Sequence, residues 1–350
     1  VYLTPKMDKQ EEIYTQAMQY LDDAIADLQK EDLIDQEAQD LLYQGDAEKW
    51  LKLAYGLKAR YTMHLLKRSA NKDADMEKVL EYVNNSFESA EEQAAFDVYD
   101  ANNINPLYGF FVARAGLGAS ESMRSKLAEY NDPRLSRAFI TKQGTSGKEQ
   151  APGTADNAVY APNGTPEQGT SKYGTSLFMY SISAPTLLLS YHELKFLEAE
   201  ALCRLGRDAK SALKDAVVAG LLNAESSFSV SRKELGKTLI NPASSITDTE
   251  AESYFDNTVE AKYTAEPLKT TMTQKYFALW GASGEATESY NDVRRMKGLG
   301  ENFIELKNPN SFPLRCPYGN SDTTTAEVKA AYGNGQYVYS ENVWWAGGSR

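Results

Sequence analysis

The chain contains 350 residues, of which 42% are hydrophobic, and it carries a formal net charge of −12 at pH 7. This hydrophobic content excludes disorder of the whole chain, and the acidic charge argues against nucleic acid as a partner, because phosphate binding needs a basic surface. No run of apolar residues reaches the length that a membrane-spanning helix needs.

The first part of the chain predicts three helices, which we place in a helical scaffold over residues 8–90. In the first helix, apolar residues recur at three- and four-residue spacing, and Asp8 with Glu11 predicts a capping box. The second helix reads GDAEKWLKLAYGLKARYTMHLLKR, with Asp46 as the expected N-cap and Trp50 on a buried apolar stripe.

A loop-rich part follows over residues 96–185. Residues 96–109 (FDVYDANNINPLYG) have no helical period, and a helix-like pattern at 110–129 must stop before Pro133, because proline disfavours helical conformation in the preceding residue. Residues 141–174 are dense in Gly, Pro, Ser, Thr and Asn. A loop of this length in a compact domain is usually functional or mobile.

The most regular stretch is Ser190–Gly206, which reads SYHELKFLEAEALCRLG. Ser190 and Glu193 predict a second capping box, and Gly206 suits the left-handed residue that follows a helix. Another amphipathic run comes directly afterwards, so we expect an antiparallel helical hairpin, the unit of helical repeat proteins. We place residues 186–225 in the scaffold.

The last part alternates weak and strong helical patterns. Residues 226–262 predict an excursion with short helical pieces, residues 265–300 return to the scaffold, and residues 301–350 are loop-rich. The whole pattern predicts one mostly α-helical domain over residues 1–350. In this domain, helical hairpins similar to tetratricopeptide repeats carry long irregular loops.

Two long motifs resemble those of the SusD/RagB family. Residues 45–60 match G-D-x-x-K-W-x-K-x-A-N-x-L-K-x-R at nine of sixteen positions, with Tyr55 where the family usually has asparagine. Residues 190–206 resemble S-Y-x-E-x-x-F-L-x-A-E-A-x-x-x-G. Both motifs lie in predicted helices.

Shorter motifs extend the resemblance in family order over nearly the whole chain. Two of them depart from the family pattern, since Thr287 replaces a tryptophan and Leu314 replaces an arginine. The motifs are NDPRL, QKY, GEATESYNDVRRMKG and FPLRCPY, at residues 131–135, 274–276, 284–298 and 312–318.

The resemblance implies a non-catalytic nutrient-binding lipoprotein at the cell surface, which captures an oligosaccharide or a peptide for a TonB-dependent transporter of the outer membrane. It also implies a leader, a lipid-bearing cysteine and the first family helices upstream of this chain. Neither Cys203 nor Cys316 fits the lipid anchor, because the anchor must be the first residue of the mature protein.

The reactive residues of the sequence favour a binding protein over an enzyme. His64 and His192 lie in amphipathic helices without a zinc-protease motif, and the sequence has no nucleophile elbow or phosphate loop. We expect solvation or pairing with Arg204, rather than catalysis, for three glutamates of one helix: Glu193, Glu198 and Glu200. We therefore expect no cofactor.

A metal site is not expected either. The two cysteines are too few for a disulfide framework or a cysteine cluster, and we expect both to be small buried thiols. The acidic residues Asp248, Glu250 and Glu252 offer hard oxygen ligands for calcium, but they lack the glycine turn of a calcium loop.

We expect the ligand site in the loops, because the aromatic residues of the helices are needed for packing. Aromatic faces can stack on sugar rings while amide side chains bond hydroxyl groups. The loop residues predicted to bind the ligand are Tyr99, Asn102, Tyr108, Tyr160 and Tyr173, with Asn103, Asn105 and Asn157 around them. If these tyrosines only pin the loops to the domain, the alternative is a site near Trp280 or in the N-terminal segment expected upstream of this chain.

A second hypothesis for the function is a helical-repeat scaffold that binds a protein or peptide partner and no small ligand. The loop content separates the two hypotheses. A pure scaffold has no need for the segments 96–109 and 150–176, which are rich in asparagine or tyrosine.

Overall fold

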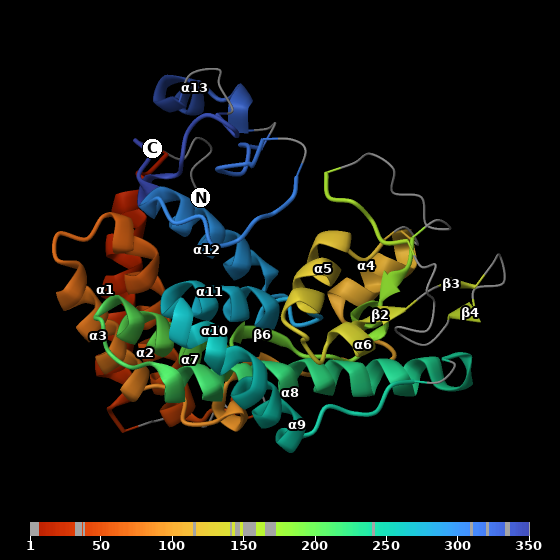
Figure 1. Ribbon diagram of the computed structural model, residues 1–350. Coiled ribbons are helices and arrows are strands. Elements are labelled where there is room, and N and C mark those ends of the chain that lie inside the picture. Colours follow the sequence, from red (N-terminus) through yellow and green to blue (C-terminus); the bar gives the residue numbers. More distant parts are fainter. Residues whose placement is uncertain are drawn as a thin grey trace.

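Helices make up most of the computed structural model, as the sequence predicts (Figure 1). No helix among the described residues is both long and apolar enough to cross a membrane. The structure describes residues 7–31, 37, 39–114, 117–140, 142–143, 148–149, 159–164, 173–239, 242–308, 311–319, 322–332 and 337–349.

Four helices form one side of the molecule, on the left of Figure 1. In chain order, the last three share a hydrophobic core, and the first packs against the second without a buried residue of its own. The Asp46 carboxylate accepts a hydrogen bond from the Lys49 amide, which confirms the predicted N-cap. The capping box predicted at Asp8 and Glu11 is wrong, because the helix begins later, at Gln10, without a side-chain cap. The four helices are α1 (Gln10–Leu28), α2 (Ala47–His64), α3 (Lys72–Asn84) and α7 (Tyr191–Arg204).

Helices α7 and α8 (Lys210–Leu235) form the predicted hairpin, and Gly206 between them has the expected positive φ of 68°. Helix α8 continues past residue 225, where we placed the end of this scaffold segment, because Phe228 and Ser231 extend its buried face. The other bounds that we gave for the scaffold and for the loop-rich parts stay predictions.

The capping box predicted at the start of α7 is half present. The Ser190 hydroxyl accepts a hydrogen bond from the Glu193 amide at 3.1 Å. The Glu193 carboxylate instead accepts hydrogen bonds from Arg60 of α2, including one of 2.8 Å from Nε. The reciprocal bond fails because a buried guanidinium needs a carboxylate more than an amide does.

A second group of short elements lies on the right of Figure 1, above the far half of α8. Its helices are α4 (Pro106–Arg114), α5 (Glu121–Glu129) and α6 (Leu135–Ala138). The strands form antiparallel pairs: β1 (Ala94–Phe96) with β6 (Thr186–Leu189), β2 (Phe139–Ile140) with β5 (Thr175–Ser176), and β3 (Lys142–Gln143) with β4 (Lys148–Glu149).

The remaining helices pack on α2, α7 and α8 or against one another, except α13, which lies apart at the top of Figure 1. Helix α11 packs against both members of the central hairpin, and α12 contacts α2 and the C-terminal turn. A π-helical turn at Phe255–Val259 joins two of the short helices. Their bounds are α9 (Asp248–Tyr254), α10 (Glu260–Ala265), α11 (Pro267–Ala278), α12 (Ala286–Leu299) and α13 (Ala326–Tyr332).

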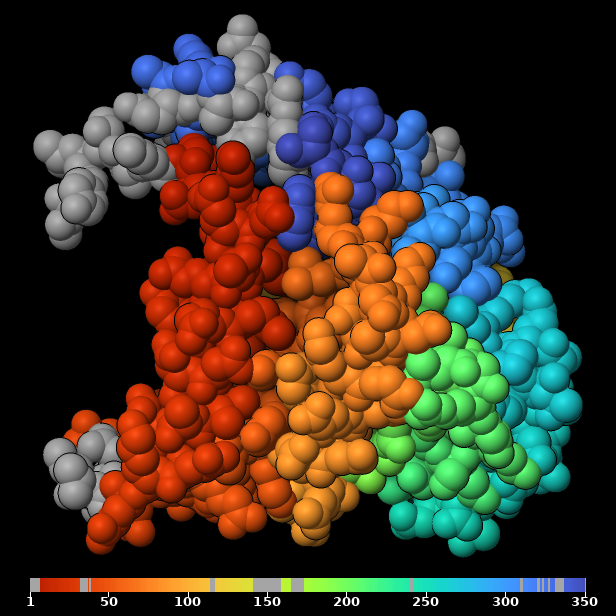
Figure 2. Space-filling view, turned by 90° about the vertical axis from the view of Figure 1, so that its left-hand side faces the viewer, coloured from red at the N-terminus to blue at the C-terminus, as the bar shows by residue number. Residues whose placement is uncertain are grey.

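The C-terminal segment returns to the first helices. Trp345 is buried and stacks on His64 of α2 with ring centroids 5.8 Å apart, and Trp344 lies beside Tyr14 of α1. Figure 2 shows this blue segment against the red and orange helices. Of the two cysteines, Cys203 is half-buried but Cys316 is exposed, so the prediction of a buried thiol is wrong for Cys316, whose segment runs along the surface.

Candidate functional site

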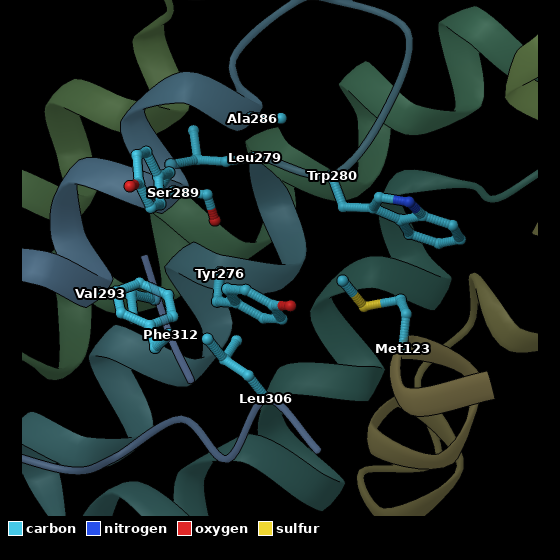
Figure 3. Close-up of a pocket in the computed structure, with 10 residues that line it drawn as sticks. Met123, Tyr276, Leu279, Trp280, Ala286, Ser289, Val293, Leu306 and Phe312 are labelled. Carbon is cyan, nitrogen blue, oxygen red and sulfur yellow. The ribbon is translucent and has the colours of Figure 1, made fainter. Parts of the chain in front are cut away.

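An apolar cleft with a volume of about 230 Å³ lies between α5, α11, α12 and the irregular segment 301–318. Figure 3 shows the hydroxyl of Tyr276 directed toward Met123, with Trp280 above it and Leu306 below. We call this the aromatic cleft. Its lining residues are Met123, Tyr276, Leu279, Trp280, Ala286, Ser289, Tyr290, Val293, Leu306 and Phe312.

Helical geometry explains why α11 and α12 present these side chains to the cleft. Each residue of a helix is rotated by about 100° from its neighbour, so Ser289, Tyr290 and Val293 share one face of α12. On α11, the side chain of Lys275 is fully buried inside the scaffold, whereas that of Tyr276 is half-buried at the cleft. The cleft is thus formed by the sides of two helices whose other sides pack in the interior.

Two hydroxyl groups of the cleft lack a hydrogen-bond partner among the described residues, those of Tyr276 and Ser289. Burial raises the pKa of the Tyr276 hydroxyl. Neither hydroxyl oxygen is among the fully buried polar atoms without a partner, so both stay open to the cleft. Both hydroxyls are therefore available to a ligand that brings its own hydrogen-bonding groups.

The aromatic side chains that flank these hydroxyls are held in place by packing. Trp280 stacks on Phe139 with centroids 5.5 Å apart and meets the edge of Phe178 at 5.1 Å. Tyr290 donates its hydroxyl to the carbonyl of Pro313 at 2.7 Å and contacts Phe312 at 5.7 Å. These contacts fix the ring orientations before any ligand arrives.

The lower wall of the cleft is anchored to a distant loop. Asn163 donates its side-chain amide to the carbonyl of Leu306 at 2.6 Å and accepts a hydrogen bond from Ser120, the N-cap of α5. Lys307, the next residue, has a φ of 50°, which is uncommon for a residue with a side chain. The Asn163 contact thus holds Leu306 against the cleft.

A second, larger cavity of about 530 Å³ lies along α8. Its floor includes Val218 and Leu222, and its rim includes Lys214 and Asp215. Tyr191 is its one tyrosine, so this cavity offers fewer aromatic faces than the cleft and suits sugar stacking less well.

The first three predicted ligand residues lie away from the lining of the cleft, Tyr99 and Asn102 in the irregular segment after β1 and Tyr108 in helix α4. The Tyr99 hydroxyl is 3.0 Å from that of Thr186 in β6, and the Tyr108 hydroxyl donates to Glu234 at 3.4 Å near the end of α8. Asn102 is exposed, and its backbone amide donates to Asp100. The Tyr99 contact thus joins its segment to β6, the Tyr108 contact joins α4 to α8, and the Asn102 contact stays within its own segment.

Tyr160 and Tyr173 are buried, each with 5% of its surface exposed, so their rings offer little surface to a ligand. Tyr160 packs its ring against Phe139 and lies under the guanidinium of Arg124, and it belongs to the same core cluster as Phe139 and Ile140 of β2. The ligand-binding role of the five residues stays a prediction.

The neighbouring asparagines differ in their surroundings. Asn105 is buried, donates to the carbonyl of Ala184 and caps the start of α4 by accepting from Leu107. Asn103 is exposed, and Asn157 lies outside the described residues.

Trp280, which we named as the alternative site, lines the aromatic cleft, whereas Tyr276 and Tyr290 were absent from our predicted ligand residues. Both tyrosines lie in family-like motifs, next to or near charged residues that face the interior, and this position could have indicated that they face a different surface.

The charged residues of the family-like motifs form a buried ion-pair network in the scaffold. Arg60 pairs with Glu193, Lys275 with Asp292 at 2.7 Å, and Arg295 with both Asp292 and Glu200. Glu200 also accepts from Arg204, the predicted partner. These paired carboxylates have a structural role, because each one balances a buried cation.

The two histidines extend this network. His64 Nε2 lies 2.8 Å from the Glu288 carboxylate, and His192 Nε2 lies 3.2 Å from that of Glu285. Within the described ranges, no group of three or more His, Cys, Asp or Glu side chains is arranged to hold a metal ion. Glu250 of the acidic triplet Asp248, Glu250 and Glu252 pairs with Arg137 at 2.8 Å.

Comparison with known proteins gives a consistent family. The family model described as SusD-like, starch-binding associating with outer membrane, matches residues 1–318. A solved structure of a SusD/RagB family protein from Bacteroides thetaiotaomicron VPI-5482 is 67% identical, with a TM-score of 0.95 over 99% of this chain and 75% of that chain. The comparison with curated proteins gives no match.

More distant structures share the fold. A chitin-binding SusD homolog from Flavobacterium johnsoniae is 19% identical, with a TM-score of 0.67 over 97% of this chain and 73% of that chain. A protein described as chitin-binding is 20% identical, with a TM-score of 0.72 over 98% of this chain and 74% of that chain.

Proposed function

Because this chain belongs to the SusD/RagB family, we propose that it captures a glycan at the aromatic cleft. Proteins of this family bind carbohydrate and are not enzymes. The observation that carries the proposal is the combination, in one cleft, of rigidly held aromatic rings with the unpartnered hydroxyls of Tyr276 and Ser289.

The chemistry of the cleft suits a sugar ring. Aromatic faces provide flat apolar contact area for the C–H faces of the sugar, and a hydroxyl can both donate to and accept from the sugar hydroxyls. The volume of about 230 Å³ is below the range of about 300–1,000 Å³ typical of sites that enclose a whole drug-sized ligand. The cleft therefore suits one ring of a chain, with the rest of the chain outside.

The same premise extends to the partner and the location. The family description, starch-binding associating with outer membrane, supports a protein at that membrane. We infer that it passes its glycan to a TonB-dependent transporter and is held at the cell surface by a lipid anchor. A shallow cleft suits this role, because a protein that delivers its cargo needs weak, reversible contacts.

The test compares the cleft with the predicted loop residues. Tyr276→Ala and Tyr290→Ala are titrated by calorimetry against a panel of neutral and acidic oligosaccharides, with Tyr99→Ala and Tyr108→Ala as matched controls. We expect the cleft variants to bind about 10- to 30-fold more weakly, as the loss of an aromatic contact suggests, and the loop variants to bind like the parent.

Two results would contradict this proposal. If the loop variants lose binding and the cleft variants keep it, the site lies in the loops. If no oligosaccharide of the panel binds the parent protein, while it captures peptides, the helical-scaffold hypothesis replaces glycan capture.

A further inference from the structure

We propose that the glycan taken by the aromatic cleft is acidic and carries a carboxylate or a sulfate group. This inference rests on the proposed function and specifies its substrate class. The observation behind it is a set of cations around the cleft that have no ion-pair partner among the described residues: Lys126, Arg294, Lys297 and Lys307.

Two of these cations lie at the side of the cleft formed by α5 and segment 301–318. Lys126 is three residues after the lining residue Met123, so both share a face of α5, and Lys307 directly follows the lining residue Leu306. The Lys126 ammonium donates to the Ser122 hydroxyl at 2.8 Å and is half-buried.

The two lysines repel each other across this side of the cleft. Burial lowers the pKa of Lys126, and the charge of Lys307 lowers it further, while Glu305 and Glu129 act weakly in the opposite direction. Like charges near one another favour a bound anion. An acidic group of the ligand would relieve this repulsion.

The other two cations lie at the side formed by α12. Lys297 is four residues after the lining residue Val293, and its ammonium lies 5.1 Å from the ring centre of Phe312. The Arg294 guanidinium lies 4.2 Å from the ring centre of Tyr290. Each cation therefore contacts an aromatic ring that lines the cleft.

Arg294 differs from most buried cations of the protein. It is 8% exposed, and among the described residues its Nε has no hydrogen-bond partner and the one hydrogen bond of its side chain runs to the amide oxygen of Asn291. Arg315, 6% exposed and equally without a carboxylate among the described residues, lies three residues after Phe312. The buried lysines and arginines that do pair with a carboxylate are Lys58, Arg60, Arg134, Arg137, Lys275 and Arg295.

Three carboxylates adjoin lining residues of the cleft. Glu288 and Glu285 lie within 3.2 Å of histidines, and Glu305 partly offsets the effect of Lys307 on Lys126. None of the residues that line the cleft is itself an aspartate or a glutamate. The whole chain has a net charge of −12, which would repel an anion at long range. Salt screens that repulsion beyond about 10 Å, so a local group of unpaired cations can still select an acidic ring.

The test uses the full chain and three hexasaccharide probes: oligogalacturonate, which carries carboxylates, a chondroitin sulfate hexasaccharide, which also carries sulfates, and neutral maltohexaose. Affinities are measured by calorimetry in 50 mM and 500 mM NaCl. We expect at least one acidic probe to bind 10-fold or more tightly than maltohexaose at low salt, with most of this preference lost at high salt. Comparing the two acidic probes identifies the recognised group.

Single variants assign the preference to the cleft. Lys126→Gln and Lys297→Gln should each weaken binding of the acidic probe by about 5- to 10-fold and leave maltohexaose binding unchanged. The matched control, Lys233→Gln, removes an exposed lysine of α8 with the same change in net charge. It should change neither affinity.

Each alternative result has a distinct meaning. If maltohexaose binds as tightly as the acidic probes and Tyr276→Ala weakens it, glycan capture stands and the acidic preference is wrong. If Lys233→Gln weakens acidic binding as much as the cleft variants do, the preference is a general charge effect and the inference is wrong. If no probe binds, both proposals are wrong for this cleft.

Discussion

Arg294 and Arg295 are adjacent on α12 and both are buried, yet their surroundings differ in kind. The Arg295 guanidinium donates to Glu200 at 2.6 and 2.8 Å and to Asp292 at 2.7 Å. Arg294 has no carboxylate partner among the described residues and lies over the ring of Tyr290 instead. The rotation of about 100° between successive helical residues turns one side chain into the scaffold and the other to the edge of the aromatic cleft, over the rings of Tyr290 and Trp345.

The same division occurs on α11. Lys275 pairs with Asp292 inside the scaffold, whereas Tyr276, the next residue, lines the cleft with an unpartnered hydroxyl. The family-like motifs therefore contain two kinds of residue. One kind is paired and holds four helices together, and the other kind faces the cleft, where a ligand could complete its contacts.

The largest expected effect tests this division at the two arginines. Arg295→Met should lower the free energy of unfolding by about 3–5 kcal/mol, because it leaves Glu200 and Asp292 buried with fewer partners. Arg294→Met should lower it by less than about 1 kcal/mol, since no ion pair is broken. Urea denaturation measures both.

Arg295→Lys provides a second measurement if Arg295→Met does not fold. It keeps the charge but loses the two-point contact with Glu200, so an intermediate loss is expected. Equal losses for the Arg294 and Arg295 variants would show that the two arginines play the same structural role.

A smaller effect concerns how the free energy of unfolding depends on pH through the buried ion-pair network. Burial raises the pKa of Glu288, but the hydrogen bond and the charge of His64 outweigh it and lower the pKa to about 2 from an ordinary value of 4.5. A carboxylate with a lowered folded-state pKa stabilises the fold above pH 4.5, and this contribution disappears as the pH falls through about 2. The difference corresponds to roughly 3 kcal/mol.

We therefore expect the free energy of unfolding to fall as the pH is lowered from 5 to 2.5. Glu288→Gln should be less stable than the parent at pH 7 and should lose less stability over this interval. If parent and variant lose stability in parallel, Glu288 does not contribute to the acid sensitivity, and the network is less important than the geometry implies.

The smallest expected effect compares two aromatic residues. Trp50 is half-buried and donates its indole N–H to Asp40 at 2.7 Å, whereas the Tyr276 hydroxyl has no partner in the described part of the chain. Trp50→Phe should lower the free energy of unfolding by about 1 kcal/mol through the lost hydrogen bond. Tyr276→Phe should change it by less than about 0.5 kcal/mol, as thermal or urea denaturation can measure. A larger loss for Tyr276→Phe would mean that its hydroxyl is structural.

Local sequence patterns were sufficient for much of the scaffold. The apolar period of the central stretch predicted α7, the side chain of Asp46 caps α2, and Gly206 adopts the left-handed conformation expected after a helix. These features depend on residues within a few positions of each other, so a single stretch contains the necessary information. The order of the motifs then indicated the family.

The long-range contacts could not be predicted in this way. Arg60 and Glu193 are 133 residues apart, and their pairing replaced half of the predicted capping box. The rings of Tyr160 and Tyr173 enter the core although their surrounding sequence is polar. Burial of a loop side chain depends on which distant elements surround it, and the local pattern does not contain that information.

The sequence by itself determined the helical class, the start of the main helices and the family to which the motifs belong, because helix periodicity and capping are local properties. Only the tertiary structure decided which motif residues pair inside the scaffold and which line a cleft. Met123, Tyr276 and Phe312 meet at that cleft from three separate parts of the chain. Their proximity is a property of the packed helices, since packing alone brings such distant side chains together.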